Sequence, residues 1–167
     1  NTALIKYMEL TGDKVKTVLI TGGLGFIGAQ IAKEMIQDNI VDKAILLDHY
    51  GGFINPLTDD FQDYRKYRLE GIEDKVVIER GETRNSIIMT KLIDKYRPEY
   101  IIHTAALPLA KIDNLNAAEA REGSVDSTAT ILEIINYFKL KDGYCPSRFT
   151  YFSSSMVYGD FQSEIAT

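Results

Sequence analysis

A glycine-rich turn between a strand and a helix is the feature that most constrains how this chain can fold. The turn reads TGGLGFIG over residues 21–28. It follows the β-branched run Lys16–Thr21 and leads into Phe26–Asn39, whose apolar residues recur at helical spacing. This strand–turn–helix context is what makes a glycine pattern credible as a phosphate-binding turn.

Gly22, Gly25 and Gly28 are three residues apart within this turn. The first glycine lets the chain turn tightly, the second lets a pyrophosphate approach the backbone, and the third lets the helix pack closely on the strand. The helix then directs its free N–H groups and its positive end at the phosphates. A turn selected only for packing would need one or two fixed glycines, so the three together predict a dinucleotide site.

Strand and helix patterns alternate along the rest of the chain. We expect strands at Lys16–Thr21, Ala44–Leu47, Lys75–Glu79, Tyr100–His103 and Arg148–Phe152, and helices at Phe26–Asn39, Asp59–Leu69, Ser86–Tyr96 and Leu115–Phe138. This alternation predicts an α/β fold: a Rossmann-type, doubly wound parallel sheet covered on both faces.

The domain organisation follows from where these patterns begin and stop. We expect residues 1–14 to be an N-terminal extension and residues 15–167 to form the dinucleotide-binding domain. A doubly wound sheet usually continues with another strand and a covering helix. We therefore expect the domain to be incomplete at its C-terminal end, with the substrate-binding part missing and one edge and part of one face of the sheet left bare.

Asp48 closes the second predicted strand, 20 residues after Gly28. This is the spacing of the carboxylate that accepts hydrogen bonds from the adenosine ribose in dinucleotide-binding folds. A carboxylate there repels a 2′-phosphate, and the next residues, His49 and Tyr50, bring no arginine to offset it. The sequence therefore favours NAD over NADP, the alternative being an aspartate that only stabilises a turn.

Composition and charge exclude several other classes of protein. The net charge of −5 gives no electrostatic basis for binding nucleic acid or an acidic membrane surface. No apolar run reaches the roughly 20 residues of a transmembrane helix. Cys145 is the only cysteine, which rules out an internal disulfide and a cysteine-rich metal site and fits a reducing cytoplasm. We expect no bound metal.

Three motifs in the expected order resemble the extended short-chain dehydrogenase/reductase family, and most of all its sugar-nucleotide epimerases and dehydratases. They are TGGLGFIG at 21–28, IIHTAAL at 101–107 and FSSSMVYG at 152–159. The resemblance covers Val18 to Gly159 and implies NAD as the cofactor and a nucleotide-sugar as the substrate.

The resemblance also implies roles for individual residues. The backbone N–H groups of Phe26 and Ile27 would lie against the pyrophosphate, Glu82 and Thr83 would meet the adenine, and Thr104, Ala105 and Ala106 would pass beneath the dinucleotide. Two alternatives stay open: Glu82 as a solvated acid at a strand end, and the small residues at 104–106 as ordinary packing. His103 is expected to be a structural residue rather than a catalyst or a metal ligand.

Ser154 is the residue that the resemblance places nearest the chemistry. Family members use a Ser or Thr at this position to hydrogen-bond the reacting hydroxyl or carbonyl, with a Tyr and a Lys from a Tyr-x-x-x-Lys motif to move the proton. No such motif follows Tyr158, so we expect the chain as given to hold the cofactor half of an enzyme and to be inactive alone. The alternative for residues 153–155 is a polar strand end.

Some residues depart from the family pattern. Ser124 and Ser127 stand where Asn and Gly are usual, Pro108 stands where some epimerases have a lysine, and Ser155-Met156 stands where 4,6-dehydratases tend to place Asp-Glu. Serine and methionine cannot serve as the acid and base for water loss, which argues against dehydration.

The favoured function is therefore an NAD-dependent nucleotide-sugar epimerase that removes a hydride and returns it to the other face. A dehydrogenase or reductase, a 4,6-dehydratase of the same family, and a non-catalytic dinucleotide-binding module remain alternatives. Relatives dimerise through long helices, so the predicted helix Leu115–Phe138 implies a possible homodimer, although its Ile131, Leu132, Ile134 and Ile135 could equally be core.

Overall fold

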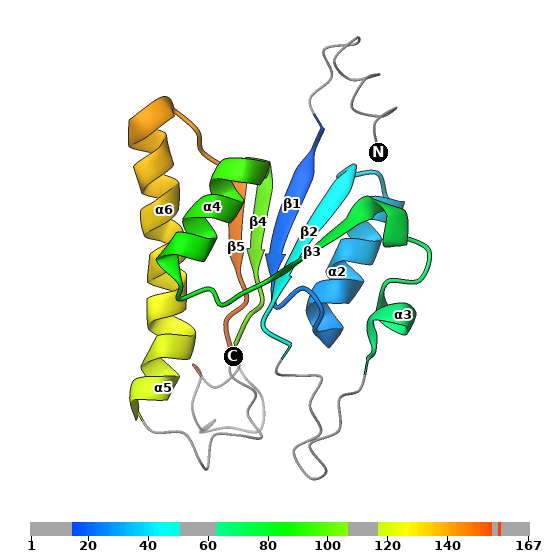
Figure 1. The fold of residues 1–167 in the computed structure, drawn as a ribbon, viewed down its shortest axis with the longest axis horizontal. Helices are drawn as coiled ribbons and strands as arrows, with labels where there is room; N and C mark the ends of the chain where they lie inside the picture. Colours follow the sequence, from blue (N-terminus) through cyan, green and yellow to red (C-terminus); the bar gives the residue numbers. More distant parts are fainter. Residues whose placement is uncertain (1–14, 51–62, 107–116, 155–156, 158–167) are drawn as a thin grey trace, which may run out of the picture.

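Five parallel strands form one sheet in the order β3-β2-β1-β4-β5 (Figure 1). The computed structural model describes residues 15–50, 63–106, 117–154 and 157. The strands are β1 (Thr17–Thr21), β2 (Lys43–Asp48), β3 (Val76–Arg80), β4 (Tyr100–His103) and β5 (Arg148–Tyr151). The chain winds outward from β1 first to β2 and β3 and then to β4 and β5, which confirms the doubly wound Rossmann fold.

Helices cover both faces of this sheet. They are α2 (Phe26–Gln37), α3 (Arg65–Arg68), α4 (Ser86–Tyr96), α5 (Ala117–Arg121) and α6 (Ser127–Asp142), with a 3-10 turn η2 (Glu73–Lys75) and a π-helical turn η4 (Glu122–Asp126). In Figure 1, α2 and α3 lie on one side of the sheet, and α4, α5 and α6 lie on the other.

Two of the predicted helices differ from what is observed. The helix expected over 59–69 is observed only as Arg65–Arg68 within the described residues, since residues 59–62 lie outside them. The helix expected to end at Phe138 continues to Asp142, where Gly143 at φ +79° ends it in the left-handed conformation. The N-terminal extension, Pro108, Ser155, Met156 and Tyr158 also lie outside the described residues.

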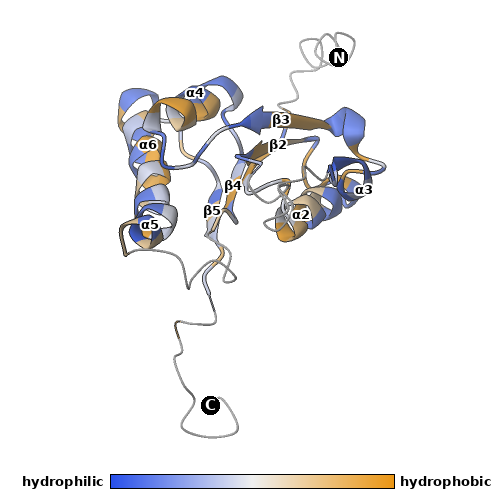
Figure 2. Cartoon of the chain, turned by 60° about the horizontal axis from the view of Figure 1, so that its bottom comes forward, coloured by the Kyte–Doolittle hydropathy of each residue, from blue (hydrophilic) through white to orange (hydrophobic). Residues whose placement is uncertain are grey.

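The sheet is buried between two apolar clusters because its central strands are apolar in the middle, at Val18–Ile20 of β1 and Ala44–Leu47 of β2. In β1, Val18 and Ile20 pack with α2, whereas Leu19 packs with α4 and α6 on the other face. Figure 2 shows the apolar colour along β2, β3 and β4 and the polar colour over α3. This two-sided burial fixes the strand register, and with it the positions of the loops that follow each strand.

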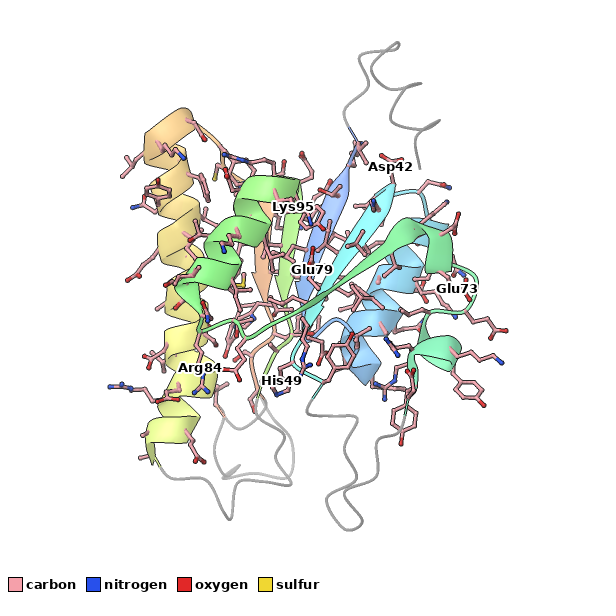
Figure 3. The ribbon with its side chains drawn as sticks, viewed as in Figure 1. Asp42, His49, Glu73, Glu79, Arg84 and Lys95 are labelled. Atoms are coloured by element: carbon pink, nitrogen blue, oxygen red, sulfur yellow. The ribbon has the colours of Figure 1, made fainter. Side chains whose placement is uncertain are left out.

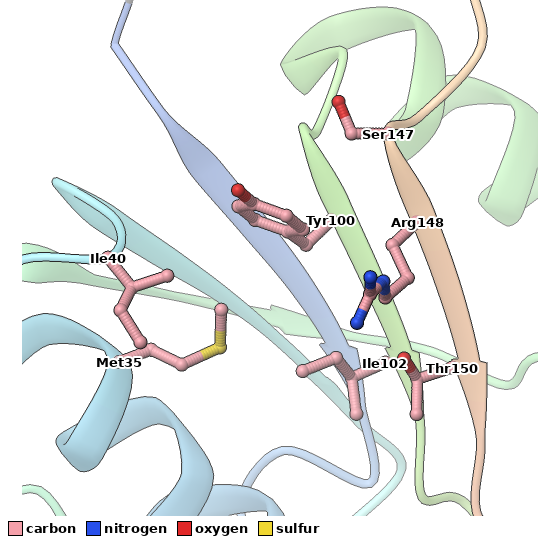
Figure 4. A pocket seen from close by; sticks show the side chains of 7 residues that line it. All are labelled: Met35, Ile40, Tyr100, Ile102, Ser147, Arg148 and Thr150. Atoms are coloured by element: carbon pink, nitrogen blue, oxygen red, sulfur yellow. The ribbon is translucent and has the colours of Figure 1, made fainter.

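One part of the sheet carries an open groove of about 470 Å³. It lies where β4 and β5 extend beyond α2, and it is lined by Met35, Ile40, Tyr100, Ile102, Ser147, Arg148 and Thr150 (Figure 4). Among the described residues, no helix has the length and apolarity needed to cross a membrane.

Candidate functional site

The turn between β1 and α2 needs three of its glycines for packing. Gly22 has φ +66°, and a Cβ there would lie 2.9 Å from the Ala105 nitrogen. A Cβ on Gly28 would lie 2.4 Å from the Gly22 carbonyl oxygen, and one on Gly23 would lie 2.7 Å from the Cβ of Leu46. Gly23 also belongs to this set, although the spacing of the motif does not single it out.

Gly25 differs from these glycines. Its backbone, at φ −66° and ψ 171°, suits any residue. Within the part of the chain that the structure describes, a Cβ there would approach only the Gly22 carbonyl oxygen, at 3.0 Å. Packing within the chain therefore requires Gly25 less than it requires Gly22 or Gly28, and the absent side chain leaves room above the turn.

The start of α2 presents N–H groups to that open space. The first helical bond runs from the Ala29 N–H to the Gly25 carbonyl, at 3.1 Å. The N–H groups of Phe26, Ile27 and Gly28 come before it and have no acceptor within the helix. Their side chains do not close the space, since Phe26 is 83% and Ile27 52% exposed. This end of a 12-residue helix has the chemistry that receives a phosphate.

Asp48 lies directly under the turn and is buried. Its carboxylate accepts hydrogen bonds from the Leu24 N–H at 3.1 Å and the Tyr50 N–H at 2.8 Å. Burial opposes its ionisation, but the hydrogen bonds from His49, Tyr50 and Leu24 outweigh burial and lower the pKa of Asp48. The turn-stabilising role is therefore present. The ribose role stays a prediction, for which the ionised carboxylate keeps spare lone pairs.

Arginines gather around Tyr50, two residues after Asp48. The guanidinium groups of Arg65 and Arg80 each lie 5.8 Å from the centre of the Tyr50 ring. Arg68 donates a hydrogen bond to the Leu24 carbonyl. These arginines do not directly follow Asp48 in the sequence. The fold brings these arginines from α3 and from the end of β3, which pairs with the end of β2.

The residues after β4 form the floor beneath the turn. Thr104 donates its hydroxyl hydrogen bond to the Thr21 carbonyl at 2.7 Å, and the Ala105 N–H donates to the Thr21 hydroxyl at 3.3 Å. The close approach of Gly22 to Ala105 explains why small residues are needed here. Ala106 is exposed at the end of this floor.

Glu82 and Thr83 follow β3 at the same edge of the sheet. The Gly81 N–H donates to the Asp48 carbonyl at 3.0 Å, so the two loops run side by side. The Glu82 carboxylate is paired with the Arg84 guanidinium at 2.6 Å, and Arg84 also pairs with Glu122 of η4 (Figure 3). Glu82 is exposed, and its role at the adenine stays a prediction.

Ser154 lies on the same edge, after β5. The Phe152 N–H donates to the His103 carbonyl at 3.1 Å, which holds the segment after β5 beside the end of β4. Ser154 is exposed, and its carbonyl accepts from the Val157 N–H at 3.2 Å. The catalytic role predicted for its hydroxyl is not tested by this geometry.

A Tyr-x-x-x-Lys spacing does occur in the chain, at Tyr137 and Lys141, and the fold places it away from this edge. The Lys141 ammonium lies 5.5 Å from the Tyr137 ring centre. Tyr137 is ten residues beyond Ser127, so it lies about 15 Å further along α6 from the carboxyl ends of the strands. This pair cannot serve a reaction at the glycine-rich turn.

The predicted site residues that the structure describes thus lie together at the carboxyl ends of the strands, around the point where the strand order reverses. Ligands of open α/β sheets bind at this place. Among the described residues, no group of three or more His, Cys, Asp or Glu side chains could hold a metal ion.

Known proteins match most of this chain in sequence. The sequence model of the NAD dependent epimerase/dehydratase family matches residues 18–167. The dTDP-glucose 4,6-dehydratase of Neisseria gonorrhoeae is 28% identical over 153 residues, which are 87% of this chain and 40% of that protein. The same enzyme of Salmonella typhimurium is 27% identical over 148 residues, 86% of this chain and 38% of the relative. The chain thus spans about 40% of the length of these curated relatives.

Solved structures share the fold. The UDP-glucose 4-epimerase of Bifidobacterium longum, in complex with NAD+ and UDP, aligns with a TM-score of 0.69 and 24% identity over 91% of this chain and 41% of that one. The ADP-L-glycero-D-manno-heptose-6-epimerase of Helicobacter pylori aligns with a TM-score of 0.68 and 23% identity over 91% and 43%. The chain therefore belongs to the NAD-dependent epimerase/dehydratase family of extended short-chain dehydrogenases/reductases, whose cofactor is NAD.

Proposed function

We propose that this chain is the cofactor-binding part of an epimerase that inverts one carbon of a nucleotide-sugar. NAD, when bound, would supply a reversible hydride acceptor and finish each turnover unchanged. The chain's own part is to seat the pyrophosphate on the N–H groups of Phe26 and Ile27 above Gly25. Asp48 would accept hydrogen bonds from the adenosine ribose, and Ser154 would hydrogen-bond the reacting oxygen of the sugar.

The observation that carries the choice of epimerase is the identity of the two residues after Ser154. Ser155 and Met156 stand where a dehydratase of this family needs an acid and a base to remove water. A hydroxyl and a thioether do not exchange protons near neutral pH. Inversion needs no such pair, because the hydride leaves and returns at the same carbon.

A 4,6-dehydratase is the second candidate, because dTDP-glucose 4,6-dehydratases are the curated relatives described above. A dehydrogenase or reductase of the same family, and a dinucleotide-binding module without activity, are the other outcomes that the test must separate. We infer that catalysis needs a Tyr and Lys pair and that the chain alone is inactive, since no such pair lies at the crevice among the described residues.

The test is turnover of the full-length protein on UDP- and dTDP-sugars without added NAD, followed by NMR and mass spectrometry. Inversion with no change in mass is the expected result. Loss of one water would identify a dehydratase, and net NADH a dehydrogenase. Retained NAD with no turnover on any sugar would favour the binding module. Ser154→Ala should abolish turnover and leave NAD affinity unchanged, whereas Ser153→Ala is the matched control.

We also propose that α6 contributes to a homodimer. Leu132 and Leu140 of α6 are 46% and 79% exposed, and Val125 of the preceding turn η4 is 61% exposed. Ile131, Ile134 and Ile135 are buried in the core instead. Sedimentation velocity should show a dimer that Leu132→Asp converts to a monomer, whereas Glu133→Gln leaves it intact. A wild-type monomer would overturn this proposal.

The remaining inference concerns location and partners. We infer a cytoplasmic protein that binds a nucleotide-sugar and neither nucleic acid nor a membrane, on the basis of its net charge and its single, exposed thiol at Cys145.

A further inference from the structure

A buried imidazole connects the glycine-rich turn to the long helix. His103, at the end of β4, is 1% exposed. Its Nδ1 lies 2.6 Å from the Thr21 hydroxyl, and its Nε2 lies 3.3 Å from the Ser127 hydroxyl. Thr21 immediately precedes the glycine-rich turn, and Ser127 is the first residue of α6. Both hydroxyl-bearing residues are buried as well.

The neighbouring bonds determine the direction of every hydrogen bond in this group. The Ser127 hydroxyl donates to the Gly123 carbonyl at 3.0 Å, so its oxygen accepts from the ring and Nε2 carries the proton. Nδ1 is then an acceptor, and the Thr21 hydroxyl donates to it. The Thr21 oxygen in turn accepts from the Ala105 N–H at 3.3 Å. We call this series, from the Ala105 N–H through Thr21, His103 and Ser127 to the Gly123 carbonyl, the His103 chain.

The His103 chain ends on the π-helical turn η4. The Ser127 N–H donates to the Glu122 carbonyl, five residues back, rather than to the Gly123 carbonyl, four residues back. The Ser127 hydroxyl bonds the Gly123 carbonyl instead. The same Ser127 hydroxyl therefore bonds the carbonyl that the π turn leaves without its usual amide donor and accepts a hydrogen bond from the imidazole Nε2. Such π turns occur often at functional sites.

Both ends of the His103 chain lie on walls of the predicted dinucleotide crevice. One end is the floor at Ala105, which Gly22 contacts. The other end is η4, whose Glu122 pairs with Arg84 in the loop that carries Glu82 and Thr83. The His103 chain thus spans the predicted crevice, from the floor at Ala105 to the predicted adenine end.

We propose that His103 is a positioning residue for the dinucleotide: its two ring nitrogens hold the glycine-rich turn and the π turn of the long helix in one fixed arrangement. This inference rests on the proposed placement of the dinucleotide at these walls. The ring exchanges no proton with substrate. It acts only by keeping Thr21 and Ser127 oriented. Removing any one hydrogen bond of the His103 chain should therefore weaken dinucleotide binding as much as replacing His103 itself.

The test compares single and double substitutions of residues in the His103 chain, made in the full-length protein. Thr21→Val and Ser127→Ala each remove one hydroxyl at opposite ends of the ring, and they do not contact each other. Each should raise the dissociation constant of NAD about tenfold, which corresponds to 1.4 kcal/mol. The double variant should raise the dissociation constant of NAD no further than the weaker-binding single variant does, because the loss of one hydroxyl already interrupts the His103 chain of hydrogen bonds. Thr130→Val, which removes a hydroxyl bonded to the Asp126 carbonyl at 2.8 Å, is the matched control and should leave affinity unchanged.

Two replacements of the ring itself sharpen the test. His103→Asn keeps an acceptor near Nδ1 for Thr21, and His103→Gln keeps a donor near Nε2 for Ser127. In the Asn variant, Ser127→Ala should cause no further change in the dissociation constant of NAD. In the Gln variant, Thr21→Val should cause no further change in it. Nitrogen NMR of the ring should show the neutral form with the proton on Nε2, and a His103→Gln spectrum assigns the signal.

The amide shifts of the unliganded protein separate this proposal from the proposed function. Ser127→Ala should shift the amides of Ala105 and of residues 22–28, although it touches none of them. Additive losses of affinity, a proton on Nδ1, or amide changes confined to α6 would each overturn the positioning role. If wild-type protein binds no NAD, the proposed function fails, while the amide shifts and the ring tautomer still decide whether His103 couples the two turns.

Discussion

Gly25 and Gly28 lie in the same turn, yet a side chain at each would meet a different obstacle. A Cβ on Gly28 would lie 2.4 Å from a carbonyl oxygen, so the backbone must shift. A Cβ on Gly25 faces space that a phosphate would fill. We expect Gly28→Ala to lower the free energy of unfolding by about 1–3 kcal/mol, as overpacking does. Gly25→Ala should cost less than about 1 kcal/mol in stability and weaken NAD binding at least about tenfold.

Urea unfolding and calorimetric titration with NAD would measure the two effects separately. A Gly25→Ala variant that binds NAD as tightly as wild type would show that the phosphates do not approach the turn at this glycine.

We propose that Asp48 sets the preference for NAD, and the arginines near Tyr50 add positive charge from other elements. Asp48→Asn removes the repulsion of a 2′-phosphate but keeps an oxygen that can accept from Leu24. We expect NAD affinity to fall about tenfold and the preference for NAD over NADP to shrink or vanish. Dissociation constants for both dinucleotides check this, with His49→Gln as the control. An unchanged ratio would assign Asp48 to the turn alone.

His103 should make stability depend on pH. Burial lowers the pKa of His103 from 6.5 to about 4. Between these values the unfolded chain binds a proton that the folded chain does not, so stability is present above pH 6.5 and is lost as the pH falls toward 4. The loss amounts to roughly 3 kcal/mol. Urea unfolding should show that the difference in the free energy of unfolding between wild type and His103→Gln is smaller at pH 4 than at pH 7 by about that amount. A constant gap would contradict it.

At the scale of elements, α4 shows how a local signal fixes a helix that carries no site residue. The Asn85 side chain accepts from the N–H groups of Ile87 and Ile88, both at 3.1 Å. Asn85→Ala removes this cap and should lower the free energy of unfolding by about 1 kcal/mol. NAD affinity should not change, because the helix itself stays packed on the sheet through Met89 and Ile93. Chemical denaturation and a binding titration together test both statements.

The elements that the sequence predicts well are those whose signals are local. Each strand is a short apolar run, and the glycine-rich turn lies between two unambiguous elements. Buried strands leave little choice of register once both faces are covered. The site residues expected at the carboxyl edge consequently lie there, because parallel strands bring their ends together.

The features that the sequence leaves unpredicted depend on contacts between distant segments. The π turn η4 is invisible in the helical pattern, and directly after it Ser127 meets His103, 24 residues away. Arg80 reaches Tyr50 only because β3 pairs with β2. Helix α3 begins at Arg65, whose N–H donates to the Asp63 carboxylate, a contact that the charged and aromatic pattern does not reveal.

At the scale of the whole molecule, a dinucleotide that binds only the folded chain should stabilise it. At one hundred times its dissociation constant, NAD should raise the free energy of unfolding by about 2.7 kcal/mol and the melting temperature by about 5 °C or more. Alkylation of the exposed Cys145 should leave this shift unchanged, because Cys145 precedes β5 at the opposite edge of the sheet. Thermal denaturation with and without NAD measures both. A shift that alkylation abolishes would contradict a site at the carboxyl edge.

The 16-residue helix α6 joins those two edges, since it begins beside His103 and ends just before Cys145. A helix of this length spans about 24 Å. A dye attached at Cys145 would therefore lie about one helix length from the proposed dinucleotide crevice, and energy transfer from the fluorescent ring of NADH to this dye would measure the separation. One labelling step at Cys145 would thus give a fluorescence signal that reports when the crevice is filled.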